Sequence, residues 1–261
     1  MRSGAIHQSS STPGRRLPPP KSPAELAPFI DHTLLRADAS EADIKKLCEE
    51  AVRHRFFAVC VNSAHVAFSS NLLAKIDPSH KQDSRVRVAA VVGFPLGACT
   101  TSTKAFETEE ALRLGAEEID MVVRVDLVKT GEFTRVREDI AAVVQAAARV
   151  KPHALVKVIL ETGLLTLEEI AHASRAADEA GAQFIKTCTG FSTAGSPAGA
   201  ATVEHVALMR ESAREHVQIK ASGGVRSFEM ARSLILAGAD RLGTSSGVAL
   251  VSEGLSSGSG Y

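Results

Sequence analysis

Several features that would point at once to a class of function are missing from this chain of 261 residues. No apolar run approaches the roughly 20 residues that a membrane-spanning helix needs. Lysine and arginine together number 30, as do aspartate and glutamate, so the formal net charge is +0. This balance gives no electrostatic reason to expect nucleic acid or an anionic membrane as a partner.

Cysteine and histidine do not form the patterns of a disulfide framework or a metal site. The four cysteines, Cys48, Cys60, Cys99 and Cys188, lie far apart and include no C-x-x-C pair. The nine histidines include no H-x-H, H-E-x-x-H or H-x-x-x-H cluster. We therefore expect reduced thiols, a cytoplasmic location and no bound metal.

The two ends of the chain differ in composition from the middle. Residues 1–21 are rich in Ser, Pro, Gly and Arg, and residues 253–261 are rich in Gly and Ser. Arg15-Arg16 could suggest a twin-arginine export signal, but Leu17 and three prolines follow where export needs an apolar stretch. We expect a disordered N-terminal extension at 1–21, a single domain at 22–252 and a flexible tail at 253–261.

One local pattern recurs along the middle segment: a helical stretch ends in Gly-Ala and a short apolar strand follows. The glycines are Gly115, Gly181 and Gly238, and Arg55 occupies the same place before another apolar run. A glycine just past a helix can adopt the left-handed conformation that ends the helix. Before Gly181, the sequence Thr166-Leu167-Glu168-Glu169 is a capping box, which predicts a helix start. Apolar or small residues at helical spacing occur at Ile44, Leu47, Cys48 and Ala51, and at Ile170, Ala173, Ser174 and Ala177.

Short apolar runs without strict alternation predict strands that are covered on both faces, as in parallel sheets. Eight such runs, with helical segments between most of them, fit a single (β/α)8 TIM barrel. A doubly wound open sheet is the rival, but no G-x-G-x-x-G follows the first strand. The predicted strands are Asp31–Leu34, Phe56–Val61, Val86–Val92, Ile119–Val123, Leu155–Leu160, Phe184–Thr187, Val217–Ala221 and Arg241–Gly243.

The repeat also predicts which side chains meet inside the barrel. Five residues after Arg55 and after each helix-ending glycine stand Cys60, Asp120, Lys186 and Gly243. These positions fall on alternate strands, which contribute side chains to a common interior layer. We expect Asp120 and Lys186 to meet there, with Gly243 leaving room beside them. A buried Asp and Lys are costly unless they pair with each other or act chemically.

Three lysines on neighbouring predicted strands point to amine chemistry. They are Lys157, Lys186 and Lys220. A lysine that ends an apolar strand can simply pack its stem and send its amine to solvent, and a buried Lys–Asp pair can be purely structural. Crowding has a chemical use, however, because a second cation and burial favour the neutral amine that Schiff-base formation needs. We predict Lys186 as the nucleophile and Asp120 as a group that relays protons.

Two Gly/Ser-rich loops predict a phosphate site. Ser222-Gly223-Gly224-Val225-Arg226 follows Lys220, and Gly243-Thr244-Ser245-Ser246-Gly247 follows the last predicted strand. Loops after strands seven and eight form the usual phosphate site of such barrels, because their backbone amides are exposed.

Eight segments, taken together, resemble the deoxyribose-phosphate aldolase family from about Ile30 to Ser246. Their order and spacing are highly specific. The segments begin at Asp31-His32-Thr33, Ala58-Val59-Cys60, Gly93-Phe94-Pro95, Glu118-Ile119-Asp120, Lys157-Val158-Ile159, Phe184-Ile185-Lys186, Lys220-Ala221-Ser222 and Arg241-Leu242-Gly243.

The resemblance implies a metal-free, cofactor-free class I aldolase that cleaves 2-deoxy-D-ribose 5-phosphate reversibly to acetaldehyde and D-glyceraldehyde 3-phosphate. It implies that Lys186 forms the imine, that Lys220 is the cation that activates it, and that Asp120 transfers protons. Family members are often dimers, so a homodimer is a candidate assembly. Supporting roles fall to Asp31, Thr33, Cys60 and Lys157, and phosphate binding to Gly190, Gly223, Gly224, Gly243, Ser245 and Ser246.

In that scheme a water molecule carries the proton between Asp120 and the substrate. Tyr261, the last residue and the one tyrosine of the chain, matches a terminal tyrosine that reaches the site and assists proton transfer in some members. A frayed terminus with no catalytic part is the alternative reading.

The chain departs from the family pattern at three places. Arg124-Val125-Asp126 stands where many members have Asn-x-Gly, Cys188 replaces a common Ser, and the loop at 194–201 is longer than usual. None of these changes removes a proposed catalytic residue. Two other functions stay open: a class I aldolase for another phosphorylated aldehyde pair, and a catalytically silent phosphate-binding barrel. An isomerase on such a barrel would instead need a Glu or His base and no essential lysine.

Overall fold

The chain folds into a closed barrel of eight parallel strands in the order β1 to β8, with β8 pairing back onto β1. We describe it from a computed structural model, which covers residues 17–77, 85–191 and 200–252. All eight strands predicted from the sequence are present, with ends shifted by one or two residues in most cases. The strands are β1 Ile30–Leu34, β2 Ala58–Val61, β3 Arg87–Val92, β4 Glu118–Val122, β5 Leu155–Ile159, β6 Phe184–Lys186, β7 Gln218–Ser222 and β8 Arg241–Thr244.

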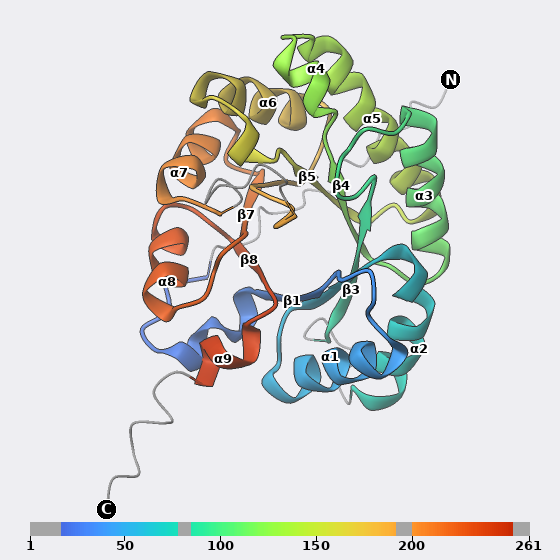
Figure 1. The fold of residues 1–261 in the computed structure, drawn as a ribbon, viewed down its shortest axis with the longest axis vertical. Coiled ribbons are helices and arrows are strands. Elements are labelled where there is room, and N and C mark those ends of the chain that lie inside the picture. Colours follow the sequence, from blue (N-terminus) through green and yellow to red (C-terminus); the bar gives the residue numbers. More distant parts are fainter. Residues whose placement is uncertain (1–16, 78–84, 192–199, 253–261) are drawn as a thin grey trace, which may run out of the picture.

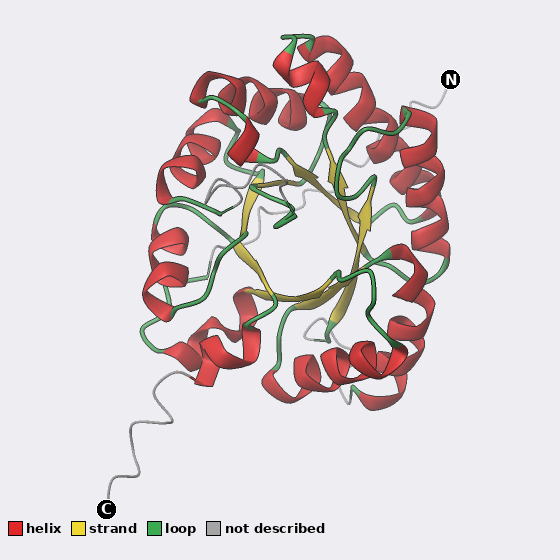
Figure 2. Cartoon of the chain, in the orientation of Figure 1, coloured by secondary structure: helices red, strands yellow, loops and turns green. Residues whose placement is uncertain are grey.

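Helices form an outer ring around these strands, as Figures 1 and 2 show. The (β/α)8 barrel predicted from the sequence is therefore confirmed. The α-helices are α1 Glu41–His54, α2 Val66–Ile76, α3 Thr101–Arg113, α4 Val125–Lys129, α5 Phe133–Val150, α6 Leu167–Glu179, α7 Val203–Ser212, α8 Phe228–Leu236 and α9 Gly247–Ser252. Short 3-10 helices are η1 Pro23–Phe29, η2 Ser63–His65 and η3 Thr162–Leu164.

The recurring Gly-Ala pattern is a helix-ending motif that precedes each even-numbered strand. Gly115, Gly181 and Gly238 all have positive φ, and so does Arg55 before β2. In each case the next amide donates back to a carbonyl five residues earlier, as from Ala116 to Ala111. This Schellman-type bond satisfies carbonyls at the helix end and turns the chain into the following strand. The repeat thus fixes where each even strand begins.

The predicted helical faces are also confirmed. In α1 the buried residues are Ile44, Leu47, Cys48 and Ala51. In α6 the capping box forms, because the Thr166 hydroxyl accepts from the Glu169 amide and the Glu169 carboxylate accepts from the Thr166 amide. These faces pack against the outer side of the strands and close the main apolar core.

The two sides of the strands differ in chemistry. Outward-facing residues such as Val59, Ile119, Val158, Ile185 and Ile219 belong to the large apolar core between strands and helices. The interior of the barrel instead holds a set of buried charged side chains and a small apolar cluster. An apolar layer would be the ordinary filling of such a barrel, so the charged interior marks the part of the molecule that needs a functional explanation.

The N-terminal boundary differs from the expected one. Residues 17–21, predicted as part of a disordered extension, lie against the barrel: Pro20 is buried, and its carbonyl oxygen accepts a hydrogen bond from Arg232 Nε at 3.2 Å. Consecutive prolines have little backbone freedom to lose, so packing them costs less entropy than packing an ordinary polar segment. Residues 1–16 and the predicted tail at 253–261 lie outside the described residues.

A membrane-spanning helix is not found in the described ranges: none of their helices combines the necessary length with sufficient apolar character.

Candidate active site

Asp120 is the centre of the charged interior, and three lysines converge on its carboxylate. Lys157 Nζ lies 2.6 Å from Asp120 Oδ1, while Lys186 Nζ and Lys220 Nζ each lie 2.8 Å from Oδ2. The residues come from β5, β6 and β7, and Asp120 from β4. All four side chains are buried. The predicted meeting of Asp120, Lys186 and the two other lysines is what the structure shows.

Two further buried carboxylates form ion pairs with two of these lysines. Lys220 Nζ lies 2.5 Å from Asp31 Oδ2, and Lys157 Nζ lies 2.7 Å from Glu118 Oε2. Arg241 bridges the same two carboxylates, since its guanidinium pairs with Asp31 and lies 2.9 Å from Glu118 Oε1. Asp31, for which the resemblance implied a supporting role, is thus part of an extensive ion network, which also includes Glu118 and Arg241.

The buried charges in this network are unequal in number. Four buried cations face three buried carboxylates, so one positive charge is in excess. Lys157 and Lys220 each contact two carboxylates within 2.8 Å, whereas the salt bridge recorded for Lys186 in the described chain goes to Asp120 alone. The cations are Lys157, Lys186, Lys220 and Arg241, and the carboxylates are Asp31, Glu118 and Asp120.

The charge state of this network follows from two opposing effects. Burial by itself would lower the pKa of Lys220, but the carboxylates of Asp120 and Asp31 outweigh burial and raise it. The pKa of Lys157 is raised in the same way by Asp120 and Glu118. Burial would raise the pKa of Asp120, but the three lysines hold it well below its ordinary value. Lys157 and Lys220 are thus cations, and Asp120 is a carboxylate, over the whole neutral range.

Gly243 and Cys60 complete the interior layer that the repeat predicted. A Cβ on Gly243 would lie 3.0 Å from Lys220 Cε and 2.8 Å from Ser222 Cβ, so only glycine leaves the lysine its room. The Cys60 thiol lies 4.0 Å from Asp120 Oδ2 and is fully buried. Burial, with the nearby Asp120, raises the pKa of Cys60 and keeps it a thiol. Thr33 donates its hydroxyl to the backbone carbonyl of Asp31, 2.9 Å away, and so braces β1.

The loops that follow β6, β7 and β8 are tied together at the carboxyl end of the barrel. Ser222 Oγ donates to the carbonyl of Cys188 at 2.5 Å, and Thr244 Oγ1 donates to the carbonyl of Val225 at 2.9 Å. Gly190, Gly223 and Gly224 have positive φ in these loops. Two serines predicted to bind phosphate follow the end of β8: Ser245 is exposed and Ser246 is half-buried.

Glu161 is a buried residue in this region to which the sequence reading gave no role. It follows β5, has a φ of +58°, and its carboxylate accepts hydrogen bonds from the Thr189 amide at 3.2 Å and from the Thr189 hydroxyl. It therefore fixes the loop that carries Gly190. A left-handed backbone at a non-glycine residue is the kind of strain that functional loops retain.

Two of the three departures from the family pattern fall on described residues, and neither of them is part of the charged cluster. Arg124 and Asp126 form a two-pronged ion pair at the start of α4, with nitrogen–oxygen distances of 2.7 and 2.5 Å. Cys188 is buried with its sulfur 3.2 Å from Thr162 Oγ1. The loop at 194–201 lies outside the described residues except for its last two positions, and Tyr261 lies outside them altogether.

The fold and the interior define an enzyme of the (β/α)8 class with a buried lysine–carboxylate centre under the carboxyl end of its strands. A model of the DeoC/LacD aldolase family matches residues 26–258, and the chain belongs to this family. The resemblance predicted from the eight segments is thereby confirmed.

Individual relatives agree over nearly the whole chain. A deoxyribose-phosphate aldolase from Carboxydothermus hydrogenoformans is 50% identical over 240 residues, which cover 92% of this chain and 99% of that protein. A deoxyribose-phosphate aldolase from Brevibacillus brevis is 51% identical over 233 residues, which cover 89% and 98%. Among solved structures, the tetrameric deoxyribose phosphate aldolase from Aeropyrum pernix superposes with a TM-score of 0.79 at 31% identity, covering 92% of this chain and 94% of that one.

Proposed function

We propose that this chain cleaves 2-deoxy-D-ribose 5-phosphate reversibly to acetaldehyde and D-glyceraldehyde 3-phosphate through a Schiff base on Lys186. The observation that carries the proposal is the convergence of three buried lysines on Asp120, with one more cation than carboxylates in the network. Lys157 and Lys220 each have a second carboxylate partner, whereas the salt bridge of Lys186 within the described chain is to the shared Asp120. This difference favours the neutral amine at Lys186. The names of the close relatives support the choice of substrate.

The chemistry assigns a role to each group. The neutral amine of Lys186 attacks the aldehyde carbon C1 of the open-chain sugar, and loss of water leaves a protonated imine. Removal of the C3 hydroxyl proton breaks the C2–C3 bond, releases the phosphorylated aldehyde and leaves an enamine on the lysine. Protonation of C2 and hydrolysis then release acetaldehyde. Asp120 takes and returns these protons through water, and Lys220 is the permanent cation beside the amine.

The phosphate of the substrate would bind to the loops after β6, β7 and β8. Their glycines let the backbone come close to the ligand, and the amides and serine hydroxyls supply hydrogen-bond donors. The proposed donors are Gly190, Gly223, Gly224, Ser245 and Ser246, while Gly243 lets the chain pass close to Lys220 and Ser222. Tyr261 stays a proposal for the same proton transfer, and its deletion with unchanged turnover would refute it.

We further propose that the enzyme works in the cytoplasm as a homodimer. The cysteines of the described chain are free thiols, which suits a reducing compartment. Light scattering of the purified chain measures the assembly, and a tetramer like that of the Aeropyrum relative is the result that would replace the dimer.

The substrate is tested by product analysis. We expect the purified chain to release acetaldehyde and D-glyceraldehyde 3-phosphate from 2-deoxy-D-ribose 5-phosphate, and to turn over unphosphorylated 2-deoxy-D-ribose with a much higher KM. Substitution of Ser245 by Ala should raise KM for the phosphorylated sugar about 10-fold, the loss of one hydrogen bond to a charged group, and leave KM for the unphosphorylated sugar unchanged. Cleavage of a different phosphorylated sugar, with acetaldehyde inert as a donor, would instead favour a class I aldolase for another phosphorylated aldehyde pair.

A further inference from the structure

Arg241 and Glu118 form an ion pair in the barrel interior beneath the lysine cluster. Glu118 precedes Asp120 by two residues on β4, and Arg241 begins β8. Arg241 Nη2 lies 2.9 Å from Glu118 Oε1, and both side chains are buried. No ion pair in the described part of the chain joins either residue to Lys186, and no chemical step proposed above uses either of them. Their cost in desolvation therefore needs an explanation.

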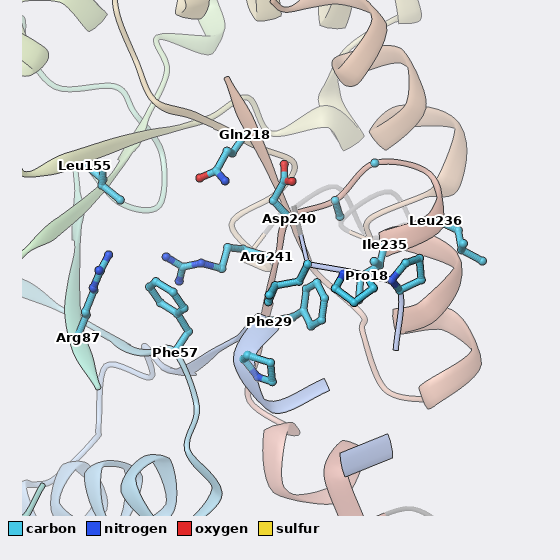
Figure 3. A pocket seen from close by; sticks show the side chains of 15 residues that line it. Pro18, Phe29, Phe57, Arg87, Leu155, Gln218, Ile235, Leu236, Asp240 and Arg241 are labelled. Atoms are coloured by element: carbon cyan, nitrogen blue, oxygen red, sulfur yellow. The ribbon is translucent and has the colours of Figure 1, made fainter. Parts of the chain in front are cut away.

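Arg241 lies toward the amino end of the strands, away from the loops proposed to bind phosphate. Figure 3 shows Arg241 reaching from β8 toward Phe57, with Arg87 nearby. Its guanidinium carbon lies 3.1 Å from the centre of the Phe57 ring, and that of Arg87 lies 4.8 Å from it. These residues border a cavity of about 620 Å³ at the amino end of the strands, whereas the Gly/Ser loops lie at the carboxyl end.

We propose that Arg241 is a positioning residue that supplies the one excess positive charge in the barrel, so that Lys186 has a neutral amine at neutral pH. The proposal rests on the function proposed above. A guanidinium is never deprotonated in a protein, so Arg241 cannot relieve the excess itself. Lys157 and Lys220 are each held by two carboxylates, and the proton is therefore lost from Lys186.

Without Arg241, the network would hold equal numbers of buried positive and negative charges. Three lysines would face Asp31, Glu118 and Asp120, and each lysine would have a negative charge to balance it. Lys186 would then stay protonated and would not form an imine. Without Glu118, in contrast, the excess would rise to two positive charges and the neutral amine would be favoured more strongly. Removing both residues would restore an excess of one.

The other charged and titratable groups around the network do not change this count. Arg87 is partly exposed and contacts Glu118 at 3.5 Å, so solvent screens it. Cys60 is a protonated thiol, as its raised pKa indicates. The groups that face the network, strand by strand, are Asp31 on β1, Cys60 on β2, Arg87 on β3, Glu118 and Asp120 on β4, Lys157 on β5, Lys186 on β6, Lys220 on β7 and Arg241 on β8.

The test measures how much of Lys186 acetaldehyde and borohydride label as a function of pH, in the wild type, Arg241→Met, Glu118→Gln and the double variant. We expect the pH midpoint of labelling to rise by about 1 unit in Arg241→Met and to fall by about 1 unit in Glu118→Gln, the size expected for a neighbouring buried charge. The double variant should return close to the wild-type midpoint.

Folding is followed by circular dichroism, and Asp139→Asn is the control. Asp139 pairs with the buried Lys104 at 2.6 Å, outside the network, so its loss should leave the midpoint unchanged. Shifts in the same direction for both single variants, or a double variant further from the wild type than either, would overturn the proposal. If Arg241→Met does not fold, the test still rests on two results: the midpoint should fall in Glu118→Gln and return toward the wild-type value in the double variant. Absence of wild-type labelling at Lys186 at every pH would instead refute the proposed function itself.

Discussion

Lys186 is the residue at which stability and activity pull in opposite directions. Lys186→Met removes the reactive amine, while Asp120 keeps its ion pairs with Lys157 and Lys220. We expect the variant to be inactive, with kcat reduced at least about 1000-fold because the covalent route is lost, and to unfold at an equal or higher urea concentration than the wild type.

Lys104→Met is the matched control for this prediction. Lys104 is also fully buried, but its removal leaves Asp139 a buried carboxylate that has lost its cation. We expect this variant to lose about 3 to 5 kcal/mol of stability. Equal destabilisation by the two substitutions would contradict the charge count.

At the scale of residues, the sequence predicts the centre of the site but not the buried ion pair of Glu118 and Arg241. Asp120 and Lys186 stand five residues after a helix-ending glycine, which places them in one layer. Arg241 and Glu118 give no such signal, because an Arg or Glu at the start of a strand is ordinarily a solvent-exposed residue. Each stands two residues before an inward-facing position, Asp120 or Gly243, and so shares its face, but their meeting depends on the closure of the barrel between β8 and β1.

At the scale of elements, the helix-ending glycines fix where the even strands begin. A Cβ on Gly115 would lie 2.7 Å from Ser70 Cβ, and the φ of this residue is +115°. We expect Gly115→Ala to reduce the free energy of unfolding by about 2 to 3 kcal/mol, through backbone strain and the clash with α2. Urea denaturation measures the change.

Gly131→Ala is the control, because Gly131 has a φ of +74° and no atom within 4 Å of the added Cβ. Its cost should be the backbone strain alone, about 1 kcal/mol. A cost at Gly115 no larger than that at Gly131 would show that the contact with α2 does not matter.

The sequence predicts the eight strands and the helix signals between them, because short apolar runs and capping motifs are local features. It does not predict the loop at Glu161, whose left-handed backbone depends on hydrogen bonds to Thr189 from the neighbouring strand end. Contacts between segments that are distant in the chain carry no local signature, and this is where prediction from sequence stops.

At the scale of the whole molecule, the buried ion network determines how stability depends on pH. Glu118 and Asp120 have pKa values below their ordinary 4.5 and 3.8, despite burial, because of Arg241 and the lysines. The folded state therefore binds fewer protons than the unfolded state in acid, and stability should fall as the pH drops below about 4.5. Lys157 and Lys220 have pKa values above 10.5, so stability should also fall as the pH rises above that value.

Thermal unfolding across pH measures this profile, and we expect stability to be lost at both limits. A steady rise in stability toward pH 3 would contradict the ionised state of the carboxylates. The barrel class follows from the sequence, but the interior network that sets this profile is a property of the closed barrel. Residues 17–21 have a composition typical of disorder, yet Pro20 is buried against the barrel and accepts a hydrogen bond from Arg232.

Borohydride reduction in the presence of acetaldehyde, followed by mass spectrometry of the peptides, tests directly whether Lys186 forms the imine. Reduction converts an imine into a stable ethyl adduct on the lysine that formed it. We predict one adduct, on Lys186, together with loss of activity, and no adduct on Lys157 or Lys220, which each contact two carboxylates. An unlabelled Lys186, or labelling spread over surface lysines, would contradict this prediction.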